Sequence, residues 1–398
     1  MNIIIKNKLK EIFSILNETP TNINNLGLID GWCGISLFKK NYSLINSKIK
    51  LNNDVEEFLL KNFESYLKNN SFDPHLTNGI SGIFWYLSYL KNKRFLYLDN
   101  NKFFNDFENY LDKILLSDCE YKNYDILYGS IGTIVFYKES GILHRKKKLQ
   151  KKIIEIIANQ AIYIENNSIR WVFASLRTKS INNDEVNFGL SHGIPSLISC
   201  LLKFDREFDN LTRPLVFKSI NNILNFENNS DSNYFNYFPD ILKVMDNKTT
   251  DYKSRLAWCY GDLGIACMLW NAGSRYSVQE WKMKAVDIVI KTTFRKVEEK
   301  ATLDIGLCHG SAGIAHIYNR FYNYTNDLRI KEASLNWLEK TLELANFSDQ
   351  FSKYNTNNQD AIVINDPSFL TGMSGVGLSL IGFLNPKTMD WDRCLQIT

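Results

Sequence analysis

A glycine step of the form Gly-x-x-Gly recurs seven times along this 398-residue chain. Its copies begin at Gly31, Gly79, Gly129, Gly193, Gly261, Gly310 and Gly372. The copy at Gly193 has Ser196 in place of the second glycine. Subtracting these numbers gives spacings of 48, 50, 64, 68, 49 and 62 residues. A spacing near 50 has room for two helices and their loops, so seven helix-pair repeats are predicted.

Two kinds of helix are predicted in the repeats. The segments after the glycine steps, such as 83–90 and 314–318, are apolar on nearly every face, which is typical of buried inner helices. The stretches 149–163 and 278–297 alternate charged and apolar residues with a period near 3.6, which predicts amphipathic outer helices. Paired glycines let helix starts pack closely around an axis. The predicted fold is therefore all-α, an α/α toroid forming a seven-fold double helical barrel.

The longer spacings on either side of the fourth repeat predict insertions before and after it. Residues 169–176 have alternating character and contain β-branched and aromatic side chains, and the polar run 182–185 follows them, so a small β-hairpin is expected there. Segments 228–233 and 355–359 are polar and are predicted to be loops. None of these has the composition of a domain linker. Residues 1–398 are therefore expected to form a single barrel domain.

Charge and cysteine content narrow the class of protein. The 47 Lys and Arg residues nearly balance the 43 Asp and Glu residues, and the basic clusters are short, so nucleic-acid binding is not expected. The odd number of scattered cysteines, seven, does not fit a disulfide framework. The N-terminal apolar run is too short for a signal peptide, and no stretch is long enough to span a membrane. We expect a cytoplasmic protein with reduced thiols.

The repeat register brings polar residues to equivalent positions. The residues immediately before the seven first glycines are Asp30, Asn78, Tyr128, His192, Tyr260, His309 and Thr371. In a toroid, these positions lie at one end of the barrel. Cys259 and Cys308 stand one residue earlier in two of the repeats. Both cysteines are therefore expected to converge with His309 and His192 on one pocket.

The residues Cys259, Cys308 and His309 have the chemistry of a zinc site. Cysteine and histidine are common zinc ligands, and three protein ligands leave a fourth tetrahedral position open, as in catalytic sites. Nearby helix N-termini favour the thiolate form of cysteine. A lone cysteine in a helical repeat is more often a core residue. That is our interpretation of the five others, Cys33, Cys119, Cys200, Cys267 and Cys394.

Four further residues are candidates for the same pocket. His192 has no adjacent cysteine, and its ordinary pKa suits a general acid or base, although it could also cap a helix. Asp125 stands four residues before the glycine of the third repeat and could be an N-cap. Arg255 stands four residues before the cysteine of the fifth repeat and could be a paired surface charge. Tyr260 could serve packing alone.

Other titratable residues are predicted to be structural. Asp304 and Asp366 stand six residues before the first glycines of their repeats, as Arg255 does in its own. Both are structural candidates only. Three histidines lie off the register and are predicted to be structural or exposed, namely His75, His144 and His316.

The chain resembles the lanthionine synthetase C-like (LanC) cyclases over nearly all of its length. The motifs that carry the resemblance are Ala257-Trp-Cys-Tyr-Gly-Asp-Leu-Gly264, Gly306-Leu-Cys-His-Gly-Ser-Ala-Gly313, Gly189-Leu-Ser-His-Gly193 and Phe369-Leu-Thr-Gly-Met-Ser-Gly-Val-Gly377. The missing glycine at Ser196 departs from the family pattern and concerns local helix packing more than chemistry.

The resemblance implies a chemistry and a set of roles. It implies a seven-fold α/α barrel with one catalytic Zn²⁺ on Cys259, Cys308 and His309. It implies that a peptide cysteine thiol adds across a dehydroalanine or dehydrobutyrine to form a thioether ring. Catalytic roles are implied for His192, Asp125 and Arg255, and Tyr260 matches the aromatic residue beside the first cysteine ligand.

The implied function is that of a stand-alone class I lanthipeptide cyclase in antibiotic biosynthesis. Its partners would be a dehydrated precursor peptide, a dehydratase and a membrane exporter, and the complex would place the protein peripheral to the membrane. One alternative keeps the site but adds glutathione to dehydroamino acids. Another is a catalytically silent toroid that binds peptide. A toroid like the protein prenyltransferases is disfavoured by the seven glycine steps and the Cys-His pair.

Overall fold

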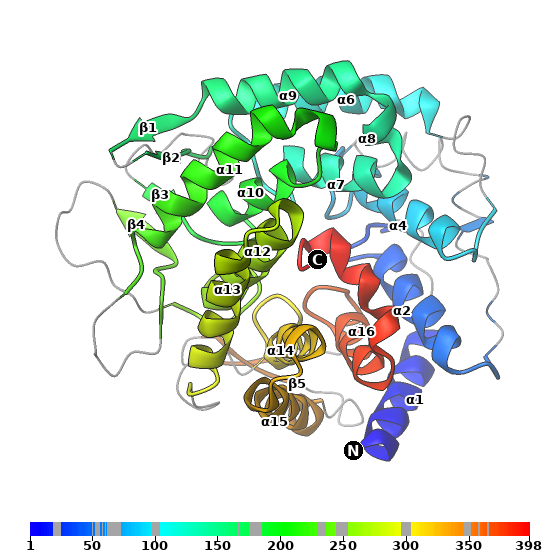
Figure 1. Cartoon of the computed structure of the whole chain (residues 1–398). Coiled ribbons are helices and arrows are strands. Elements are labelled where there is room, and N and C mark those ends of the chain that lie inside the picture. Colours follow the sequence, from blue (N-terminus) through cyan, green and yellow to red (C-terminus); the bar gives the residue numbers. More distant parts are fainter. Residues whose placement is uncertain are drawn as a thin grey trace. The chain divides into compact units, whose positions relative to one another are not determined.

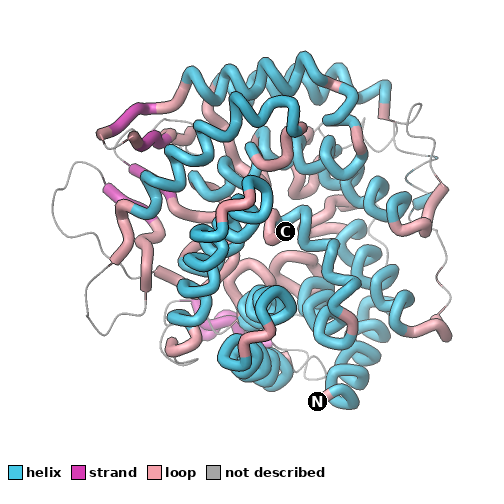
Figure 2. Tube along the Cα trace, viewed as in Figure 1, coloured by secondary structure: helices cyan, strands magenta, loops and turns pink. Residues whose placement is uncertain are grey.

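The computed structural model describes most of the chain in two compact units. The described residues are 1–18, 25–49, 51, 56–57, 59, 61, 73–97, 104–165, 167–174, 185–228, 236–243, 254–295, 304–345, 352–356, 359–363 and 366–398. The first unit comprises Met1–Leu96 and Lys296–Trp391, and the second comprises Tyr97–Arg295 and Asp392–Thr398. Helices predominate in both units, and the strands are short (Figure 2).

The first unit is built on four inner helices. Its helices are α1 (Asn2–Glu18), α2 (Trp32–Ile45), α4 (Ile80–Asn92), α14 (Ser311–Thr325), α15 (Leu328–Leu344) and α16 (Met373–Leu384). The inner helices pack side by side in the order α14, α16, α2 and α4. Helix α15 packs against α14, and α1 packs against α2 and α16 (Figure 1). The 3-10 helix η2 (Pro386–Leu395) follows α16.

The second unit repeats this plan with three inner helices. Its helices are α6 (Asn105–Glu120), α7 (Ser130–Ser140), α8 (Ile142–Arg145), α9 (Lys147–Asn159), α10 (Ile194–Leu201), η1 (Arg206–Phe208), α11 (Asp209–Leu224), α12 (Asp262–Tyr276) and α13 (Gln279–Thr292). Helices α7, α10 and α12 pack in that order, with α6 on α7, α11 on α10 and α13 on α12 (Figure 1). No helix within the described ranges is long and apolar enough to cross a bilayer.

All seven inner helices begin directly after the first glycine of a glycine step, as the sequence predicts. The second glycine allows a close approach. A Cβ atom on Gly82 would lie 2.0 Å from the carbonyl oxygen of Leu76 in the preceding loop. Helix α10 forms without this glycine. The buried hydroxyl of Ser196 there accepts a hydrogen bond from the Gln396 side chain at 2.8 Å.

We expect Gly82→Ala to lower the free energy of unfolding by about 1–3 kcal/mol, because the new methyl group overpacks a buried contact. Chemical denaturation of the purified protein measures this change. Ser88→Ala in the same helix is the matched control, since the Ser88 hydroxyl donates to the carbonyl of Phe84 one turn earlier within the same helix. Equal stability of the two variants would contradict the close-approach argument.

Backbone hydrogen bonds tie together the loops that precede the inner helices of the second unit. The N–H of Ile126 donates to the carbonyl of Ser191 at 3.3 Å. The N–H of Ser191 donates in turn to the carbonyl of Cys259 at 3.4 Å. The positions just before three glycine steps are thereby gathered at one end of this unit.

The first unit has the same arrangement. The backbone N–H groups of Leu307 and Cys308 both donate to the carbonyl of Leu370, at 2.8 and 3.1 Å. Further along, the N–H of Phe369 donates to the carbonyl of Ile29 at 2.9 Å, and the N–H of Ile29 donates to the carbonyl of Thr77 in the next loop at 2.9 Å. Four loops are thus connected, so the register predicted from the glycine steps corresponds to spatial neighbours within each unit.

The strands around the fourth repeat differ in extent from the prediction. The outer helix predicted over 149–163 ends at Asn159 in α9, and residues Ile162–Ile164 form strand β1 instead. Strand β1 pairs antiparallel with β2 (Ser168–Arg170), and Asn167 between them has a φ of 55°, which a turn requires. A hairpin is therefore present before the fourth repeat, but it spans 162–170 instead of the predicted 169–176, and residues 171–173 form no strand. The β-branched Ile162 and Ile164 favour a strand at the earlier position.

Two further antiparallel strand pairs are present in the described residues. Strand β3 (Glu185–Asn187) precedes the fourth repeat and pairs antiparallel with β4 (Ile241–Lys243), which follows it. The segment 355–359, predicted to be a loop, is not one throughout. Its ends belong to the antiparallel strands β5 (Ser352–Thr356) and β6 (Gln359–Val363). The predicted loop 229–233 and the run 182–184 lie outside the described residues.

Candidate metal centre

The Cys308-His309 step lies in the loop before α14. Its position follows from the hydrogen bonds of Leu307 and Cys308 to the Leu370 carbonyl. The imidazole Nε2 atom of His309 lies 2.9 Å from a carboxylate oxygen of Asp304. The Asp304 side chain is only 3% exposed, whereas that of His309 is 23% exposed. The loop therefore presents His309 to an accessible region while holding its carboxylate partner inside.

Cys259 lies in the equivalent loop before α12 and is buried. The indole of Trp258 anchors this loop by donating to the carbonyl of Leu395 at 2.8 Å. The carbonyl of Cys259 accepts two hydrogen bonds from Ser191, one from its hydroxyl at 3.2 Å and one from its backbone N–H at 3.4 Å. The backbone around Cys259 is thus fixed on both sides.

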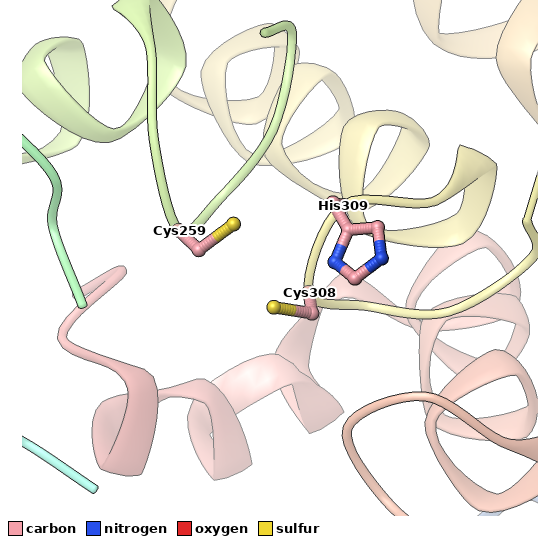
Figure 3. Close-up of side chains that lie close together, drawn as sticks. All are labelled: Cys259, Cys308 and His309. Atoms are coloured by element: carbon pink, nitrogen blue, oxygen red, sulfur yellow. The ribbon is translucent and has the colours of Figure 1, made fainter. Parts of the chain in front are cut away.

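Cys259, Cys308 and His309 offer ligand atoms that all lie within 4.8 Å of one another (Figure 3). In a tetrahedral zinc site with Zn–S bonds of about 2.3 Å, ligand atoms are separated by roughly 3.5–3.8 Å. The observed spacing needs only small side-chain adjustments to reach that geometry. Two thiolates and a neutral imidazole are also a donor set that zinc prefers. The residues therefore fit this metal.

His192 and Asp125 form a second pair of groups suited to chemistry. The Nδ1 atom of His192 lies 2.5 Å from an oxygen of the Asp125 carboxylate. The other carboxylate oxygen accepts the backbone N–H groups of Leu127 and Tyr128, at 2.7 and 2.9 Å. Asp125 is therefore oriented by its own loop, and it leaves the Nε2 atom of His192 available to a substrate.

The environment of His192 raises the pKa of its imidazole above the ordinary value. Burial alone would lower this pKa, but the hydrogen bond and charge of Asp125 outweigh burial, with a smaller contribution from Cys259. The protonated form of His192 therefore persists to higher pH than that of a free histidine. Such a group can both take up and deliver a proton near neutral pH.

Tyr260 lies beside this pair. Its ring centroid is 6.0 Å from that of His192, and its hydroxyl accepts a hydrogen bond from the Asn187 side chain at 3.1 Å. Burial raises the pKa of the Tyr260 phenol, which keeps it protonated and able to donate. The second unit therefore brings together three predicted site residues, His192, Asp125 and Tyr260.

Arg255 differs from these three because its side chain is exposed. Its backbone N–H donates to the carboxylate of Asp240, and its charge also favours the ionised form of that group. Even so, burial raises the pKa of Asp240 to about 6. Asp240 was not predicted from the sequence, because it lies in the insertion after the fourth repeat and outside the glycine register.

The residue six positions before each first glycine shapes the loop that precedes the inner helix. In six repeats this residue is Asn or Asp, namely Asn25, Asp73, Asn123, Asn187, Asp304 and Asp366. In five of these, all but Asn123, a side-chain oxygen accepts the N–H two residues further on, which shapes the loop. The fifth repeat has Arg255 instead. The loop there ends at Gly261 with a φ of 96°, a conformation that favours glycine.

The residues predicted to be structural are placed accordingly. All five cysteines outside the register are buried, and burial raises the pKa of Cys200 to about 12. His144 is largely exposed and faces Asp205. His316 is buried against the ring of Trp391, and His75 contacts Asp73. None of these residues belongs to the group formed by Cys259, Cys308 and His309 in the part of the chain that is described.

Comparisons with known proteins identify a family and a fold for this chain. A family model described as lanthionine synthetase C-like protein matches residues 22–396. Among solved structures, nisin cyclase superimposes with a TM-score of 0.70 and 18% sequence identity, covering 99% of this chain and 97% of that chain. No curated protein sequence matches. The structural likeness is one of fold, and it confirms the all-α toroid predicted from the glycine repeats.

Proposed function

Because the chain belongs to the lanthionine synthetase C-like family, we propose that it is a zinc-dependent lanthipeptide cyclase. It would add cysteine thiols to dehydroalanine or dehydrobutyrine residues of a dehydrated precursor peptide. The observation that supports this most directly is the cluster of Cys259, Cys308 and His309, the donor set of a catalytic zinc site. A dehydratase that supplies the substrate and an exporter that removes the product are the proposed partners.

Zinc, when bound, would lower the pKa of a substrate thiol and keep it nucleophilic at neutral pH. The reaction then needs a proton to leave sulfur and a proton to reach the α-carbon. A bond forms between sulfur and the β-carbon, while the carbon–carbon double bond becomes an enolate. We assign proton transfer to His192, whose raised pKa suits both directions of transfer.

The remaining residues stabilise charge and geometry in this proposal. Asp125 holds the imidazole of His192 with Nε2 free and stabilises its protonated form. Tyr260 can donate a hydrogen bond from its protonated phenol. Arg255 is exposed, so its guanidinium is available to a substrate carbonyl that becomes an enolate oxygen.

The test uses a synthetic peptide with one dehydroalanine and one downstream cysteine, together with purified protein and zinc. We expect loss of the free thiol without a change in peptide mass, measured by alkylation and mass spectrometry. A parallel reaction contains glutathione and a dehydroalanine peptide without cysteine. A glutathione adduct without cyclisation would favour the alternative enzyme. Full retention of zinc with neither product across varied peptides would favour a silent peptide-binding toroid and contradict the proposal.

A further inference from the structure

We propose that Asp304 is a positioning residue that sets which nitrogen of His309 is available to the metal. This inference rests on the proposed zinc-dependent function, and it concerns a residue that the sequence pattern marks as structural only. The key observation is the 2.9 Å distance from the Asp304 carboxylate to Nε2 of His309.

The two nitrogens of His309 face different surroundings. One ring nitrogen points toward the sulfur atoms of Cys259 and Cys308, and the other lies on the far side of the ring (Figure 3). Since Nε2 is the atom beside Asp304, the nitrogen that faces the sulfurs is Nδ1. The contact does not have hydrogen-bond geometry, but the negative charge of the carboxylate lies against Nε2 and favours the tautomer with hydrogen on that atom. That tautomer leaves the lone pair of Nδ1 free for a metal.

The Asp304 carboxylate is itself held in place by its loop. One oxygen accepts the backbone N–H of Gly306 at 2.7 Å, and the backbone carbonyl of Asp304 accepts the N–H of Ser311 at 2.9 Å. A Cβ atom on Gly310 would lie 2.0 Å from the same carboxylate oxygen. The absence of a side chain at Gly310 therefore makes room for the carboxylate. One oxygen accepts a hydrogen bond from the loop, and the other lies in contact with Nε2 of His309.

Asp366 in the next repeat shows what the same position does without a histidine. One of its oxygens accepts the backbone N–H of Ser368 at 2.8 Å, which matches the bond from Gly306 to Asp304. Its other oxygen accepts the hydroxyl of Thr371 at 2.7 Å, and Thr371 occupies the register position of His309. The loop-shaping bond is thus common to both repeats, while the partner of the second oxygen differs.

Asp304→Asn separates these two roles. The amide oxygen can keep the bond from Gly306, which directs the NH₂ group toward His309. That group donates to Nε2 and so favours hydrogen on Nδ1, the nitrogen that must bind the metal. We expect zinc affinity to fall by about 10- to 100-fold, as for other residues that orient a metal ligand. Competition with a chromophoric chelator measures this affinity.

Asp366→Asn is the matched control and is expected to bind zinc as tightly as the unsubstituted protein. Both variants are checked for folding by circular dichroism and thermal melting. Histidine-selective ¹⁵N labelling of the metal-free protein reports the tautomer directly, since the chain has only five histidines. We expect hydrogen on Nε2 of His309 in the unsubstituted protein and on Nδ1 in the Asp304→Asn variant. Loss of the assigned signal in His309→Gln identifies the residue.

The outcomes distinguish the positioning role from the proposed function. Hydrogen on Nδ1 of His309 in the unsubstituted protein would overturn the positioning role, even if Asp304→Asn did not fold. Unchanged zinc affinity in a folded Asp304→Asn variant would also overturn it, while leaving cyclase activity unaffected. A third outcome is that Asp304→Asn binds zinc more weakly while the unsubstituted protein forms no thioether ring. That outcome would support the positioning role and contradict the proposed function. A protein that binds no zinc would contradict both.

Discussion

Cys308→Ala is expected to eliminate stoichiometric zinc binding and to lower the rate of thioether formation by at least about 100-fold. Metal activation of a nucleophile contributes several kcal/mol to catalysis, and each ~1.4 kcal/mol corresponds to a tenfold change in rate. Removal of one thiolate from a three-residue donor set leaves two protein ligands, which is too few for a stable tetrahedral site. Elemental analysis of the purified variant measures zinc, and thiol alkylation measures cyclisation.

The control for this prediction is Cys267→Ala. Cys267 belongs to α12 and is buried, but it lies off the glycine register and outside the three-residue cluster. Its replacement is expected to leave zinc content at one ion per chain and to affect stability alone. If Cys308→Ala retained zinc, or if both cysteine variants lost it equally, the proposed donor set would be wrong.

His192→Ala is expected to have the second-largest effect, a loss of roughly 10²- to 10⁴-fold in cyclisation rate with zinc content unchanged. The separation of the two effects follows from geometry, because the His192 imidazole contacts Asp125 and is not one of the three clustered ligands. Single-turnover assays at saturating peptide measure the rate. Loss of zinc in the folded variant would show that His192 supports the metal centre rather than proton transfer.

The pH dependence of the cyclisation rate in Asp125→Asn also tests whether His192 transfers the proton, because the direction in which the inflection moves can be predicted. The carboxylate of Asp125 raises the pKa of His192, so its neutralisation lowers that pKa. If His192 acts as a base, the rate rises as pH increases through this pKa. If it acts as an acid, the rate falls there. In either case we expect the inflection to move to lower pH in the variant. An inflection at the same pH would assign it to another group.

The inner helices and their shared register were predictable because they depend on local chemistry. A first glycine precedes each of the seven inner helices, and apolar residues follow it on nearly all faces. The register also predicted that Cys259, Cys308 and His309 would be neighbours, and it placed His192 and Tyr260 at equivalent positions. The family resemblance already implied that Asp125 orients the imidazole of His192, and the structure adds their contact across 67 positions of sequence.

Other features depend on tertiary contacts that no local pattern records. Strand β4 (Ile241–Lys243) follows the fourth repeat in the sequence, and it forms because it pairs with β3, which precedes that repeat. Asp240 stands beside that strand, and its raised pKa results from burial in the folded chain. The polar residues of 355–359 suggested a loop, but Asn355 and Thr356 continue a strand because a partner lies opposite.

Asp304 shows a limit of a different kind. Its sequence position is shared with Asp366 and is explained well by loop geometry alone. Only the distance to Nε2 of His309 reveals a second partner. A structural role and a functional role can therefore occupy the two oxygens of one carboxylate, and the sequence register distinguishes them only through the residue that follows five positions later.

Backbone hydrogen bonds join neighbouring loops in each unit, and every amino acid except proline can supply both of the groups that they need. Side chains next to these bonds can therefore change without removing the support beneath them. Tyr128, which is 44% exposed just before the third glycine step, is one such position. Replacement of the Tyr128 side chain is therefore expected to cost little stability, so the sequence can vary at this end of the second unit while the loops keep their arrangement.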